Sequence, residues 1–74
     1  MSTVDYLLSA ATRLIPDARR RAVAHGEPQM ICEIDQDDDR VFRIYPHTYA
    51  DRAEFMAFGG LILAVVYPDG AVER

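Results

Sequence analysis

A chain of 74 residues has room for one small core, so we expect residues 1–74 to form a single compact domain. The net charge of −4 argues against direct binding of nucleic acid or of a membrane surface, because both need a basic protein surface. Cys32 is the only cysteine, which excludes an internal disulfide, and one cysteine with two histidines cannot complete a structural zinc site.

The first predicted element is a helix from about Thr3 to His25. Apolar residues recur in it at spacings of three and four, which places them on one helix face. They are Val4, Leu7, Leu8, Ala11, Ile15, Ala18 and Ala22. Ser2 with Asp5 resembles a capping box, and Gly26 suits the C-terminal end. Pro16 removes one helical hydrogen bond, but the apolar spacing keeps its phase across it. The sequence therefore predicts one kinked helix, with two short helices meeting at Pro16 as the alternative.

Two strands joined as a hairpin are predicted next. From about Gln29 to Asp35, apolar and polar side chains alternate as in a half-buried strand, and only Ile31 breaks the alternation. Residues 36–39 form the tip, and the return strand runs from Arg40 to Tyr45. We expect Met30, Cys32, Ile34, Phe42 and Ile44 to face the helices. The residues expected on the opposite face are Ile31, Val41, Arg43 and Tyr45.

The rest of the chain predicts a second helix and a buried strand. Thr48 with Asp51 can cap a helix over Tyr49 to Phe58, which Gly59 ends. The run Leu61 to Tyr67 is continuously apolar, rich in β-branched residues and bounded by glycine and proline, as in a buried strand. Pro68-Asp69-Gly70 is a turn signal, and a short tail follows it.

This order, α-β-β-α-β, predicts a small α+β domain of two layers, with both helices on one face of a three-stranded sheet. A strand that is apolar on both sides needs cover on both faces of its sheet. We therefore expect the second face to contact a partner protein or a second copy of the chain through Ile31, Val41, Arg43 and Tyr45. The alternative is that the tail or a bent first helix covers this face.

The hairpin tip carries the strongest local charge, from Asp35, Asp37, Asp38 and Asp39. Their spacing matches the opening of a calcium loop, but Arg40 stands where glycine is needed and Pro46 where glutamate closes the loop. We therefore expect no metal. The four carboxylates are candidate partner-binding residues that imitate a row of phosphates before a basic groove; a solvated turn is the alternative.

No arrangement of residues predicts catalysis. His25 ends the first helix, His47 precedes the second, and Cys32 on the inward side of its strand is expected to behave as a small apolar residue. The sequence has no glycine-rich phosphate loop, so we expect no cofactor. Its N-terminus lacks the pattern of a signal peptide, which predicts a cytoplasmic protein.

In size, acidity and lack of catalytic residues, the chain resembles the small accessory proteins of phages and plasmids, such as anti-CRISPR or anti-restriction inhibitors. This resemblance involves no aligned residues. The leading hypothesis is a non-enzymatic module that acts by occupying a partner protein, most concretely an inhibitor of a nucleic-acid-handling complex. A homodimeric accessory protein of the antitoxin, immunity or chaperone-like kind is the first alternative. A small enzyme that uses His25 or His47 is the second.

Overall fold

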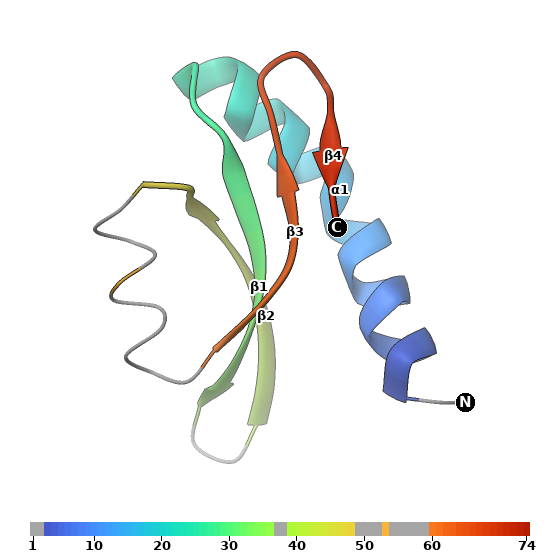
Figure 1. The fold of residues 1–74 in the computed structure, drawn as a ribbon. Coiled ribbons are helices and arrows are strands. Elements are labelled where there is room, and N and C mark those ends of the chain that lie inside the picture. Colours follow the sequence, from blue (N-terminus) through green and yellow to red (C-terminus); the bar gives the residue numbers. More distant parts are fainter. Residues whose placement is uncertain (1–2, 37–38, 49–52, 54–59) are drawn as a thin grey trace.

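The computed structural model describes residues 3–36, 39–48, 53 and 60–74 (Figure 1). Within these residues, one helix and four strands have defined bounds: α1 (Thr3–His25), β1 (Gln29–Gln36), β2 (Asp39–Pro46), β3 (Leu61–Val66) and β4 (Val72–Glu73). The strands make one antiparallel sheet in the order β2-β1-β3-β4, and α1 lies against one of its faces (Figure 1). The α+β class is as predicted.

The helix α1 is continuous across Pro16, so the alternative of two short helices is wrong. Pro16 is on the exposed side of the helix, and the hydroxyl of Thr12 donates a 2.8 Å hydrogen bond to the carbonyl of Leu8 in the turn before it. The helix ends at Gly26, which has a φ of 67° and donates its N–H to the carbonyl of Ala22 at 2.9 Å. This left-handed glycine is the predicted helix end.

The prediction of three strands and two helices is not matched, because the tail after Gly70 pairs with β3 as β4. Gly70 has a φ of 95°, and its N–H donates to the carbonyl of Tyr67 at 2.9 Å, which closes the predicted turn. The carboxylate of Asp69 accepts a 2.9 Å hydrogen bond from the N–H of Ala71 and fixes the chain as it leaves the turn. The helix predicted over Tyr49 to Phe58 lies outside the described residues, apart from Ala53.

The register of the hairpin corrects the predicted faces of β1. Met30 lies opposite Tyr45 and Ile31 opposite Ile44, and residues directly opposite each other share a face of the sheet. Ile31 and Ile44 face α1, whereas Met30 and Cys32 lie on the face opposite α1, which we call the far face. The prediction for Phe42 and Ile44 is therefore right, and the prediction for Met30, Ile31, Cys32 and Ile34 is wrong.

A β-bulge in β3 explains why its sequence is apolar on both sides. The pairing with β1 shifts between Ile31 and Cys32, which pair with Ala64 and Ile62, so Leu63 is the extra residue. The bulge reverses the alternation of β3 at this point. As a result Ala64 contributes to the core beneath α1, while Ile62 packs on the far face.

The sheet carries a buried cluster on each face. Beneath α1 these residues are Ile15, Ala18, Ile31, Ala64 and Val66. On the far face they are Met30, Cys32 and Val65, with Ile34, Tyr45, Ile62 and Tyr67 partly buried around them. The centre of the far face is therefore buried within a single chain, which contradicts the prediction that this face is uncovered.

Candidate functional site

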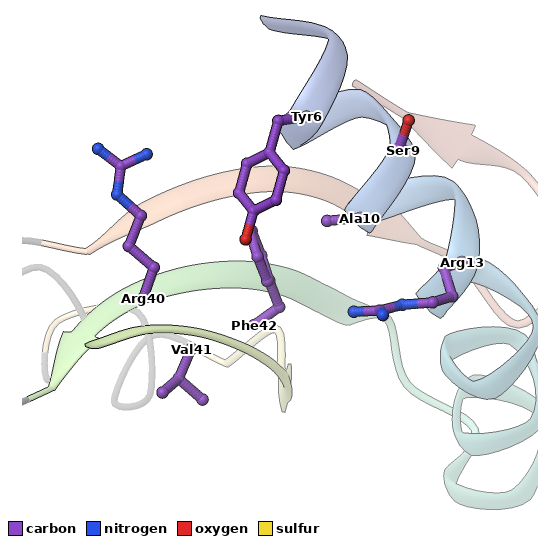
Figure 2. Close-up of a pocket in the computed structure, with 7 residues that line it drawn as sticks. All are labelled: Tyr6, Ser9, Ala10, Arg13, Arg40, Val41 and Phe42. Carbon is purple, nitrogen blue, oxygen red and sulfur yellow. The ribbon is translucent and has the colours of Figure 1, made fainter. Parts of the chain in front are cut away.

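Among the residues that the structure describes, a hollow of about 460 Å³ lies between the N-terminal half of α1 and the start of β2 (Figure 2). It exists because α1 packs over β1 and β3 through Ile15 and Ala18, and leaves β2 beside the helix. In the described part of α1, the buried positions begin only at Ala10. Figure 1 shows the N-terminal end of α1 and the β1–β2 hairpin diverging.

An aromatic pair spans this hollow from α1 to β2 (Figure 2). The rings of Tyr6 and Phe42 meet edge to face, with their centroids 5.6 Å apart and an angle of 60° between their planes. Phe42 and Arg40 lie on the side of β2 that faces α1, whereas Val41 points to the other side of the strand (Figure 2). The alternation of β2 thus presents one aromatic and one cationic side chain to the hollow.

Arginines lie on both sides of the aromatic pair. Figure 2 shows Arg13 reaching from α1 on one side and Arg40 rising from β2 on the other. Arg40 is 3.4 Å from the carboxylate of Glu33 on β1, and its side chain is still 56% exposed. Arg13 has no hydrogen-bond or ion-pair partner within the described part of the chain. Its guanidinium is therefore available to an anionic group.

A second hollow of about 280 Å³ continues the first along the helix, and Phe42 lines both. Leu14, Asp17 and Arg21 line it from α1, and Ile44 lines it from β2. Asp17 forms an ion pair with Arg20. We call the two hollows together the α1–β2 groove.

The strand beside this groove is an edge of the sheet. Among the described strands, β2 pairs with β1 on one side only, and it is eight residues long. The N–H of His47 donates to the carbonyl of Pro28 at 2.8 Å and so points toward β1. Because backbone groups alternate sides along a strand, the N–H groups of Arg40, Phe42 and Ile44 point away from β1. Pro46 is one of these outward positions, where a missing N–H costs no ladder bond.

The predicted partner-binding residues lie in several separate places in the structure. Ile31 is fully buried beneath α1, so it is not on a surface in the folded chain. Tyr45 is half-buried at the margin of the far-face cluster, and Val41 is half-buried opposite Ile34. Arg43 is exposed and lines the α1–β2 groove. Asp39 is exposed at the start of β2, while the side chain of Asp35 and all of Asp37 and Asp38 lie outside the described residues.

The far face does not present a reactive thiol. Cys32 is fully buried between β2 and β3, and this burial raises the pKa of its thiol to about 12. A thiol with this pKa is protonated at neutral pH and is a poor nucleophile or metal ligand. The prediction that Cys32 behaves as a small apolar residue is confirmed, although it lies on the face opposite the predicted one.

The two histidines lie apart from the groove. His25 is exposed at the end of α1, and His47 lines a smaller hollow of about 170 Å³ with Tyr67 and Glu73. The hydroxyl of Tyr67 donates a 2.8 Å hydrogen bond to the carboxylate of Glu73, which raises the pKa of Tyr67. Among the residues that the structure describes, no group of three or more His, Cys, Asp or Glu side chains could hold a metal ion.

Tyr6 and Arg13 are not predicted as site residues from the sequence, because both lie off the apolar stripe of the helix. A signal was nevertheless present. Tyr6, Arg13 and Asp17 recur at helical spacing and form a second face of α1, while Arg40, Phe42 and Ile44 alternate along β2. Neither pattern shows that this face of α1 lies beside β2, because the position of β2 at the edge of the sheet depends on tertiary structure.

No family model matches the sequence, and neither a curated protein nor a solved structure is significantly similar to it. A search of the described residues finds no helix with the length and apolar character needed to cross a membrane.

Proposed function

We propose that the chain is a non-enzymatic protein-binding module that acts by occupying a partner, and that it takes up one extended segment of that partner as a new strand beside β2. The observation that carries this proposal is the long edge of β2 next to the α1–β2 groove, which no other described strand pairs with. An unpaired strand edge presents a row of N–H and C=O groups to any extended chain. Recognition by strand addition combines these backbone bonds with pockets for alternate side chains.

The groove supplies such pockets. Side chains on one side of an added strand would stand next to those of Arg40, Phe42 and Ile44, since neighbouring strands lie about 4.8 Å apart. Tyr6 and Phe42 offer apolar surface there, and the two hollows of about 460 and 280 Å³ have room for side chains. An added strand would thus gain both its backbone hydrogen bonds and side-chain contacts.

Backbone amide exchange tests this proposal. Peptides of about ten residues, the length of a long strand, are selected from a random displayed library for binding to the protein. The selected peptides are then mixed with the protein in solution. We expect them to slow hydrogen exchange at the outward amides of Arg40, Phe42 and Ile44. The amides of Val41, Arg43 and Tyr45 already bond to β1 and are the internal control, because their exchange should change little.

Two results would contradict the proposal. Binders that leave the exchange of Arg40, Phe42 and Ile44 unchanged would show that β2 is not the docking edge. Protection of the same three amides in the free chain at high concentration, together with dimers in sedimentation, would instead support the homodimeric accessory protein.

The concrete form of the proposal is an inhibitor of a nucleic-acid-handling complex, supported by the acidic tip at the end of the same hairpin. Asp39, the described part of this tip, is exposed. We expect the wild-type chain to inhibit cleavage by a purified RNA-guided nuclease, and the triple variant Asp37→Asn, Asp38→Asn, Asp39→Asn to inhibit it much less. Folding stability should change by less than about 0.5 kcal/mol per substitution, because turn positions at the surface matter little.

The salt dependence of inhibition is the control for this prediction. If the tip imitates phosphates, inhibition by the wild type weakens as salt is raised, because exposed charges are screened. Equal inhibition by the wild type and the triple variant at every salt concentration would show that the tip only solvates the hairpin.

A further inference from the structure

From the charges along the α1–β2 groove, we infer that the segment bound beside β2 is acidic. This inference rests on the strand-addition function proposed above and adds the chemistry of the partner. The chain has twelve acidic residues and eight arginines, yet among the described residues four arginines and one acidic residue line the groove. The groove therefore has the opposite charge to the chain as a whole.

The states of Arg13, Arg21 and Arg40 leave charge available to a ligand. Arg13 and Arg21 have no hydrogen-bond or ion-pair partner within the described residues. Arg40 forms an ion pair with Glu33, with 3.4 Å between Nε and the carboxylate. The only acidic residue in the groove, Asp17, is already paired with Arg20. Guanidinium groups bind carboxylates through paired N–H donors, so glutamate or aspartate side chains are the groups that complement this lining.

The geometry of strand pairing determines which positions of the added strand carry these carboxylates. On an added strand, the residue opposite Arg40 has its side chain on the α1 side of the sheet, next to Arg40, while Arg13 lies on the other side of the aromatic pair (Figure 2). Two positions further on, the residue opposite Phe42 meets the aromatic pair. The expected partner segment is extended, with acidic and apolar side chains alternating along its groove side.

The same charges disfavour a second copy of the chain as the occupant. Pairing β2 with another β2 would bring Asp39, Arg40 and Arg43 of the second copy, a net positive charge, to an edge that already carries the same three residues. Like charges on neighbouring strands are destabilising. A partner with an acidic strand is favoured instead.

Three matched peptides test this inference. They share one sequence of about ten residues whose groove side alternates charged or polar with apolar residues, and they carry glutamate, glutamine or lysine at the charged or polar positions. By calorimetry we expect the glutamate peptide to bind about two- to fivefold more tightly than the glutamine peptide for each arginine engaged, and the lysine peptide not to bind. This preference should shrink as salt is raised from about 0.05 M to about 0.5 M.

Substitutions of single arginines show whether the preference for glutamate arises in the groove. Arg13→Gln and Arg40→Gln should each reduce the preference for glutamate over glutamine about two- to fivefold. Arg74→Gln, which removes the same charge outside the groove, is the matched control and should leave the preference unchanged. An equal loss in all three variants would show a general effect of net charge and overturn the inference.

The outcomes separate this inference from the function on which it rests. Equal binding of the glutamate and glutamine peptides, with Arg40, Phe42 and Ile44 amides protected by both, would overturn the acidic partner and leave strand addition in place. Tight binding of the glutamate peptide without protection of these amides would overturn strand addition itself.

Discussion

Replacing Ile31 with alanine should destabilise the fold by about 3 kcal/mol, within the range of about 2–5 kcal/mol that is typical of buried Ile→Ala changes. Ile31 is fully buried, and it lies between Ile15 and Ala18 of α1 and Ala64 of β3 in one cluster. Removing its side chain leaves a cavity beneath the helix that neighbouring strands cannot fill. A 74-residue domain has a total stability of about 4–11 kcal/mol, so this loss is large.

Thermal and urea denaturation followed by circular dichroism measure this effect. The midpoint temperature should fall by more than about 10 °C. Val23→Ala is the matched control, because Val23 lies on α1 but is 67% exposed, and its loss should cost less than about 0.5 kcal/mol. Equal stability of the two variants would mean that Ile31 does not lie under α1 and that β1 has the opposite face toward the helix.

This experiment also tests the main correction to the sequence analysis. The alternation of Met30, Cys32 and Ile34 indicated one apolar face of β1, and it was placed toward the helices. A tip of two or four residues, however, puts even-numbered residues of β1 opposite odd-numbered residues of β2. The predicted tip, residues 36–39, already implied that Met30 and Phe42 lie on different faces. The pattern indicates that a strand is half-buried but not which of its faces meets the helix.

Local signals predicted the elements well. The phase of the apolar stripe across Pro16, Gly26 at the helix end, and Pro68-Asp69-Gly70 at the turn all correspond to the structure. These features depend on residues close together in the chain. The short strand β4 was missed because two residues are too few to show an alternation, and they form a strand only because the turn brings them to β3.

The candidate site depended on information that local patterns do not contain. The exposure of the β2 edge follows from the strand order, and the groove follows from the position of α1 over β1 and β3. The hairpin itself was predicted, as was the placement of Phe42 on the helix side. Its partner Tyr6 was not, because an aromatic residue off the apolar stripe indicates a contact only when the element beside it is known.

Alkylation of Cys32 should be slower than that of an unstructured thiol by on the order of a thousandfold at pH 8. Only the thiolate reacts, and a thiol with a pKa of about 12 is ionised in about one molecule in ten thousand at this pH. Cys32 is also fully buried, so the reagent has little access in the folded chain. The reaction that remains passes through unfolding, and Ile31→Ala should accelerate it.

The same pKa predicts how stability depends on pH. The folded thiol has a raised pKa of about 12, against the usual value of 9.0, so between these values the unfolded chain loses a proton that the folded chain keeps. Stability is therefore complete below about pH 9 and falls by about 1.4 kcal/mol per pH unit above it, until the folded thiol also ionises.

Cys32→Ala isolates this effect from other groups that titrate in alkaline solution. The variant should be less stable than the wild type at pH 7, by about 1 kcal/mol for the lost packing, and the difference should shrink and then reverse between pH 9 and pH 12. Urea denaturation of both proteins at each pH gives this comparison. A constant difference across the range, or rapid alkylation of the folded wild type at pH 8, would show that the thiol is solvated and that the far face opens around Cys32.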